Sequence, residues 1–80
     1  MRLYVGNLAL DVSEPDLLEL FGGAGTVSSV QLVIDRHTGK SRGFAFVEMP
    51  DADAERALQK FNGQSLKGRP LAINEARPRA

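Results

Sequence analysis

The sequence predicts an α+β fold with the element order β-α-β-β-α-β. Two stretches, residues 14–21 and 51–61, space their apolar residues three or four apart, which is typical of helices that cover a core. Residues 42–49 instead alternate small aliphatic side chains with aromatic and charged ones, which is typical of a strand with one buried and one open face. This order predicts a ferredoxin-like split-βαβ domain, in which a four-stranded antiparallel sheet carries both helices on one face.

The first half of the chain is expected to supply two strands and one helix. Residues 2–7 form the first strand. Ser13 is a suitable N-cap for the helix, because its side chain can accept a hydrogen bond from the first turn, and the glycines of residues 22–25 end it. The second strand is expected over residues 26–35. The apolar residues expected to face the core are Leu17, Leu18, Leu20, Phe21, Val27, Val30, Leu32 and Ile34.

The second half is expected to supply the remaining helix and strands. A polar, glycine-containing loop at residues 36–41 predicts a hairpin connection into the strand at residues 42–49. Pro50 ends that strand, and Asp51 is expected to cap the second helix. The last strand is expected over residues 71–76. The apolar residues expected to face the core are Met49, Ala54, Ala57, Leu58, Phe61, Leu71 and Ile73.

Length and composition indicate one small globular domain. The chain has 80 residues, of which 42% are hydrophobic and 25% charged, as in an ordinary folded protein. It has no cysteine, so a disulfide or thiolate–metal framework is excluded and a reducing, cytoplasmic location is expected. Neither a membrane span of about 20 apolar residues nor a signal segment is recognisable. We expect a monomer with a domain at residues 1–76 and a short basic tail at residues 77–80.

Aromatic residues gather on the face that the helices are expected to leave open. Phe44 and Phe46 alternate with the core-facing residues of their strand, and Tyr4 joins them if the first strand lies alongside. One such ring could simply be a cross-strand packing partner. Three rings on an uncovered face favour a binding surface, and we expect them to lie coplanar and exposed, as a platform on which nucleotide bases stack.

The two aromatic strands resemble known motifs. Leu3 to Leu8 and Arg42 to Met49 resemble the hexamer and octamer motifs of the RNA recognition motif family, and the octamer matches seven of the eight positions of the family pattern. Met49 departs from the aromatic of that pattern, at a position expected to face the core. The resemblance covers residues 3–76 and extends to small stand-alone bacterial members of the family. It implies non-catalytic binding of a few nucleotides of single-stranded RNA, as an RNA chaperone or post-transcriptional regulator.

The resemblance also implies roles for individual residues. Tyr4 and Phe46 would stack on two successive bases, Phe44 would pack against the sugars between them, and Arg42 would pair with a phosphate. From their expected positions, other polar residues could contact bases or the RNA backbone, although each could equally be a solvated surface group. This set consists of Gln31, Asn74, Lys40 and Arg77, and it also includes Glu48, Arg36, Ser41 and Arg79.

Charge limits the strength of the expected binding. The net charge is zero, whereas nucleic-acid-binding domains are usually basic. Six carboxylates and only two basic residues fall in the two expected helices, so the acidic charge should lie behind the sheet. The other basic residues, Lys67 and Arg69 among them, are expected at the open face and its rim. Binding should therefore depend on stacking more than on charge, with a modest salt dependence.

Three other functions compete with RNA binding. The same platform could take single-stranded DNA, because the contacts that distinguish the two sugars depend on fine geometry. The acidic helical face could hold a basic protein partner. An enzyme on this fold would need an anion-binding loop or paired catalytic groups, and neither is recognisable. His37 lacks the clustered partners of a metal site, so we expect no catalytic residue, metal or cofactor.

Overall fold

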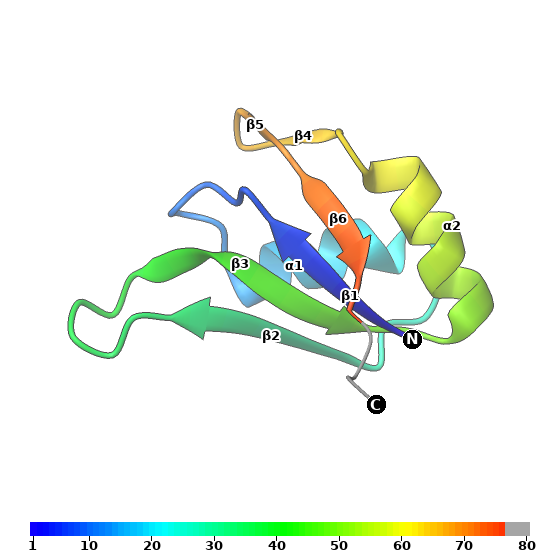
Figure 1. The fold of residues 1–80 in the computed structure, drawn as a ribbon, viewed down its shortest axis with the longest axis horizontal. Helices are drawn as coiled ribbons and strands as arrows, with labels where there is room; N and C mark the ends of the chain where they lie inside the picture. The colour runs from blue at the N-terminus through cyan, green and yellow to red at the C-terminus, as the bar shows by residue number, and fades with distance from the viewer. Residues whose placement is uncertain (77–80) are drawn as a thin grey trace.

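A computed structural model of the chain describes residues 1–76. Four strands form one antiparallel sheet in the order β2-β3-β1-β6, with α1 behind it (Figure 1). A separate two-stranded hairpin, β4-β5, precedes the last strand. The elements are β1 (Arg2–Gly6), α1 (Glu14–Gly22), β2 (Ser29–Ile34), β3 (Ser41–Glu48), α2 (Asp51–Phe61), β4 (Ser65–Leu66), β5 (Arg69–Pro70) and β6 (Ala72–Glu75). The predicted β-α-β-β-α-β order and fold class are confirmed, with the small hairpin as an addition.

The core lies between the sheet and the two helices. Phe21 of α1 and Phe61 of α2 meet edge to face, with ring centroids 5.4 Å apart, and so join the two helices. Met49 is buried, as expected from its place at the end of the octamer. The other core residues of the sheet and helices include Leu3, Val5, Leu17, Ala45, Val47, Ala54, Ala57, Leu71 and Ile73. Burial of this apolar surface is the main favourable term in the stability of the fold.

The two helices begin differently. Ser13 caps α1 as expected: its side chain accepts a hydrogen bond from the Asp16 N–H, and the Asp16 carboxylate accepts one from the Ser13 N–H. The prediction that Asp51 caps α2 is wrong. Pro50 occupies the cap position and has no side-chain hydrogen bond to offer. Asp51 is instead the first helical residue, and its carboxylate lies 3.0 Å from the Met1 ammonium group.

Two of the residues expected in the core are exposed. Leu18 is 52% exposed, because α1 packs through Leu17 and Phe21 and turns Leu18 toward its flank. Ile34 is 50% exposed. It is the last residue of β2, where the β2–β3 register becomes irregular. At this end of the sheet the β2–β3 hairpin extends beyond α1 (Figure 1).

The same irregularity involves Gly43. This residue has a φ of +87°, which a glycine adopts without strain. Its carbonyl oxygen accepts a hydrogen bond of 2.9 Å from the Leu8 N–H, so the loop after β1 is fixed to β3. The bend in β3 therefore ties the first loop of the chain to the sheet just before the two phenylalanines.

Candidate functional site

One row of side chains crosses all four strands of the sheet. Tyr4 on β1 is the register partner of Phe46 on β3 and of Asn74 on β6, and Phe46 is the partner of Gln31 on β2. Partners in an antiparallel register point to the same face. The row therefore reads Gln31–Phe46–Tyr4–Asn74, and it brings together four of the residues that the sequence analysis selected from distant parts of the chain.

Phe44 completes a cluster of three rings on this face. Its centroid lies 5.8 Å from that of Tyr4 and 6.2 Å from that of Phe46, and Tyr4 and Phe46 are 5.9 Å apart. All three side chains are partly exposed. The expectation that the rings are coplanar is wrong. Tyr4 and Phe44 are inclined by 32°, whereas Phe46 stands at 62° to Tyr4 and 84° to Phe44, because aromatic rings in contact favour edge-to-face geometry.

Tyr4 lies down on the sheet over Gly6. A Cβ atom added at Gly6 would fall 2.8 Å from Cε1 and 2.9 Å from the hydroxyl oxygen of Tyr4. The ring thus occupies the space that a side chain at Gly6 would need. Sequence reasoning did not identify this role for Gly6, because nothing in a strand pattern indicates which way a ring two residues earlier will lean.

Arg2 covers the Phe46 ring. Its guanidinium carbon lies 4.4 Å from the ring centroid, and its Nη2 is 3.5 Å from Oε1 of Gln31, at the limit of a hydrogen bond. Arg2 starts on β1, passes over Phe46 on β3 and ends at Gln31 on β2. Arg2 was not among the residues that the sequence predicted for the site.

The side chains predicted to contact the RNA backbone lie at the end of the β2–β3 hairpin. Arg42 and Lys40 are both exposed. Arg42 lines an open recess together with Gln31, Arg36 and His37, so basic side chains extend from the row toward the loop. Arg77, and the tail at residues 77–80, lie outside the described residues.

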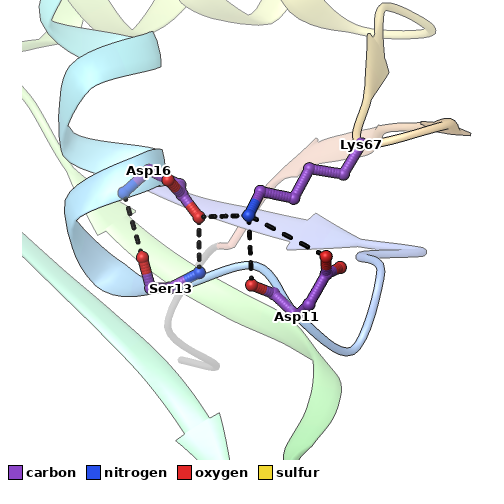
Figure 2. A network of polar contacts seen from close by, with 4 residues as sticks. All are labelled: Asp11, Ser13, Asp16 and Lys67. Carbon is purple, nitrogen blue, oxygen red and sulfur yellow. Dashed lines mark hydrogen bonds and ion pairs between the residues drawn. The ribbon is translucent and has the colours of Figure 1, made fainter.

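Lys67 does not belong to the rim of the open face. Its ammonium group lies 3.3 Å from the Asp16 carboxylate and 3.9 Å from that of Asp11, at the start of α1 (Figure 2). Both residues at the tip of the β4-β5 hairpin, Lys67 and Gly68, have positive φ, as a tight hairpin turn requires. Hydrogen bonds from the main chain and then the side chain of Ser13 are the largest causes that hold the pKa of the Asp16 carboxyl below its ordinary value of 3.8, and Lys67 contributes less.

Arg69 is also held by a contact within the protein. Its guanidinium donates to the side-chain oxygen of Asn7 at 2.9 Å, and the Asn7 amide donates to the Pro70 carbonyl at 2.7 Å. These contacts fix the hairpin to the loop after β1. Among the residues that the structure describes, Lys67 and Arg69 are thus both held by contacts within the protein, whereas Arg2 lies on the ring cluster.

The two helices carry most of the acidic charge, as expected. Neither Glu14, Asp16 nor Glu19 on α1 has a basic neighbour within that helix. Glu48, however, is exposed on β3 next to the row, so the open face is not uniformly basic. Within residues 1–76, no helix is long and apolar enough to cross a membrane.

Fold, motifs and ring cluster define this chain as a member of the RNA recognition motif family, whose model matches residues 3–72. The relative RbpA of the cyanobacterium Synechocystis is 51% identical over 81 residues, covering 99% of this chain and 79% of its own. The crystal structure of RNA binding protein PG1 superposes with a TM-score of 0.93 at 46% identity, covering 100% of this chain and 98% of that one. A Sxl-lethal protein/RNA complex superposes with a TM-score of 0.91 at 31% identity, covering 99% of this chain and 48% of that one.

Proposed function

We propose that this protein binds single-stranded RNA by stacking bases on its sheet, without catalysing a reaction. The observation that carries the proposal is the row Gln31–Phe46–Tyr4–Asn74, which sets two partly exposed rings between two exposed amides. Rings provide affinity that tolerates any base, at about 1–3 kcal/mol for each stack. Amides can donate to and accept from base edges, so the ends of the row would set the sequence preference.

The surrounding residues extend this assignment. Phe44 lies beside both rings of the row and would pack against the sugars between two stacked bases. Arg42 and Lys40, exposed at the β2–β3 hairpin, would contact phosphates. Arg77 is assigned to the RNA as well, on its place in the sequence directly after the last strand.

Comparison with relatives supports the class of ligand. One similar solved structure is a protein/RNA complex, and another is described as an RNA binding protein. We further propose that residues 1–76 form the RNA recognition motif domain and that the protein acts as a monomer in the cytoplasm, while single-stranded DNA stays open as a second ligand of the same surface. Sedimentation with and without RNA tests the monomer, and fractionation of cells tests the location.

Phe46→Ala and Phe44→Ala test the site directly. Phe46→Ala should lower the affinity for a labelled, short, random-sequence RNA by about five- to 150-fold, which corresponds to the loss of one stack. Phe44→Ala removes the packing against the sugars and should lower the affinity as well. Leu18→Ala is the matched control, because it removes a partly exposed apolar side chain from the helical face. It should leave the affinity unchanged.

Two further arms of the same titration complete the test. Single-stranded DNA of matched sequence shows whether the same surface also takes DNA, and RNA recovered from the mixture should be intact. If both phenylalanine variants keep their fold by circular dichroism and still bind like the unmodified chain, the sheet is not the RNA site.

A further inference from the structure

The contact between Arg2 and Phe46 gives Arg2 a place in the binding site. A guanidinium 4.4 Å from the ring centroid lies on the face of the ring, whereas Tyr4 and Phe44 contact Phe46 at steep angles of 62° and 84°. The side chain of Arg2 therefore occupies the kind of surface on which a base stacks. The protein itself supplies a flat, cationic partner for this ring.

Arg2 reaches Phe46 although a carboxylate lies across from it. Its register partner on β3 is Glu48, and Phe46 is the diagonal neighbour, within reach of a long side chain. The ion pairs found among residues 1–76 do not join Arg2 to Glu48. The position of the guanidinium is thus determined by the ring and, at 3.5 Å, by Gln31.

The contact is weak enough to open. An exposed cation–π contact contributes about 0.5–1 kcal/mol, and a hydrogen bond of 3.5 Å adds little. A stacked base contributes about 1–3 kcal/mol, so a base can displace the guanidinium from the ring. An open recess lined by Arg2, Phe46 and Glu48 adjoins the contact and leaves room for the side chain to move.

A displaced guanidinium need not leave the site. Its plane stacks on a base as well as on an aromatic ring. We propose that Arg2 is a stacking residue of the RNA site: it covers Phe46 in the unbound protein and, when RNA binds, lies on the outer face of the base, which is then held between Phe46 and Arg2. This inference rests on the proposed function, because it requires a base on Phe46.

Arg2→Lys is the decisive variant, because it keeps the charge and removes the plane. Arg2 is exposed, so the fold should be retained. The affinity for a labelled, short, random-sequence single-stranded RNA should fall by about two- to fivefold, while the dependence of affinity on salt should stay the same. Arg56→Lys, the same change on α2, is the matched control and should bind like the unmodified chain.

A double-mutant cycle shows whether Arg2 acts through Phe46. In a Phe46→Leu background the further change Arg2→Lys should have no effect, since no base is then held on the ring. Tyr4 is the only tyrosine and the chain has no tryptophan, so quenching of its fluorescence reports independently whether RNA reaches the row in each variant.

Each other outcome overturns the inference in a recognisable way. Unchanged affinity of Arg2→Lys would show that the guanidinium plane is not used. Tighter binding would show that Arg2 only competes with the base. If Arg2→Lys still lowers the affinity in the Phe46→Leu background, Arg2 contacts another part of the RNA. If the unmodified chain does not bind RNA at all, the proposed function fails and this inference with it.

Discussion

Gly6→Ala should weaken RNA binding without unfolding the protein. The added Cβ would lie 2.8 Å from Cε1 and 2.9 Å from the hydroxyl oxygen of Tyr4, whereas ordinary contact begins at 3.4 Å. The ring must therefore retreat by about 0.6 Å or more, which lifts its far end from the sheet. The residues that build the core are not involved, so the change is confined to the surface that Tyr4 presents.

The expected loss of binding free energy is the part of the stacking on Tyr4 that the tilted ring no longer provides. Removing a ring costs about 1–3 kcal/mol of binding free energy, and a tilted ring retains part of that. We expect a loss of about 1 kcal/mol, or roughly fivefold in affinity. Alanine in a strand is favoured over glycine by about 0.5–1 kcal/mol, which offsets the displacement of the ring, so the free energy of unfolding should change by less than about 1 kcal/mol.

Fluorescence anisotropy of labelled RNA and urea denaturation measure the two quantities side by side. Gly22→Ala is the matched control, because a Cβ there meets nothing within 4 Å, and it should leave the affinity unchanged. Tyr4→Ala sets the upper limit of the loss. The reasoning is refuted if Gly6→Ala binds RNA as tightly as the unmodified chain, or if its weaker binding is matched by loss of folded protein.

Two further predictions concern stability. Because the pKa of Asp16 is held below its ordinary value of 3.8, its contacts stabilise the fold fully above that pH and lose effect as the pH falls through the lower, folded-state pKa. The urea midpoint of Asp16→Asn should therefore lie below that of the unmodified chain at neutral pH and approach it in acid; a constant gap would contradict this. Gly25→Ala should lower the free energy of unfolding by about 1–3 kcal/mol. The added Cβ would lie 2.6 Å from Oδ2 of Asp53, which accepts a hydrogen bond from the Thr26 N–H. An unchanged thermal midpoint would contradict this prediction.

The sequence was sufficient to predict the order of helices and strands along the chain and to select the four residues that the sheet brings into one row. Alternation in β3 separates Ala45 and Val47 from Phe44 and Phe46, and a two-residue period leaves little freedom in the face to which each side chain points. The cap of α1 was also predictable, because Ser13 and Asp16 satisfy each other's main-chain groups locally. Both the alternation and the cap depend on residues close together in the chain.

The features that sequence analysis missed depend on the ends of elements and on contacts between strands. Ile34 has a core-facing pattern, but the helix layer ends before the strand does. The tilt of Phe46 and the position of Arg2 follow from how neighbouring rings and a long side chain pack across three strands. The contacts of Lys67 with α1 required the β4-β5 hairpin, which is only two residues long on each side.

Under the proposed function, recognition and folding depend on different residues of the same sheet. The two outer members of the row, Gln31 and Asn74, are exposed and belong to the outer strands of the sheet. The core is instead built by residues that alternate with the row, such as Ile73 beside Asn74 and Val47 beside Phe46. Exchange of these two amides for other polar side chains would alter what is recognised at little cost in stability. A protein built in this way can acquire a new target by single substitutions, with its scaffold unchanged.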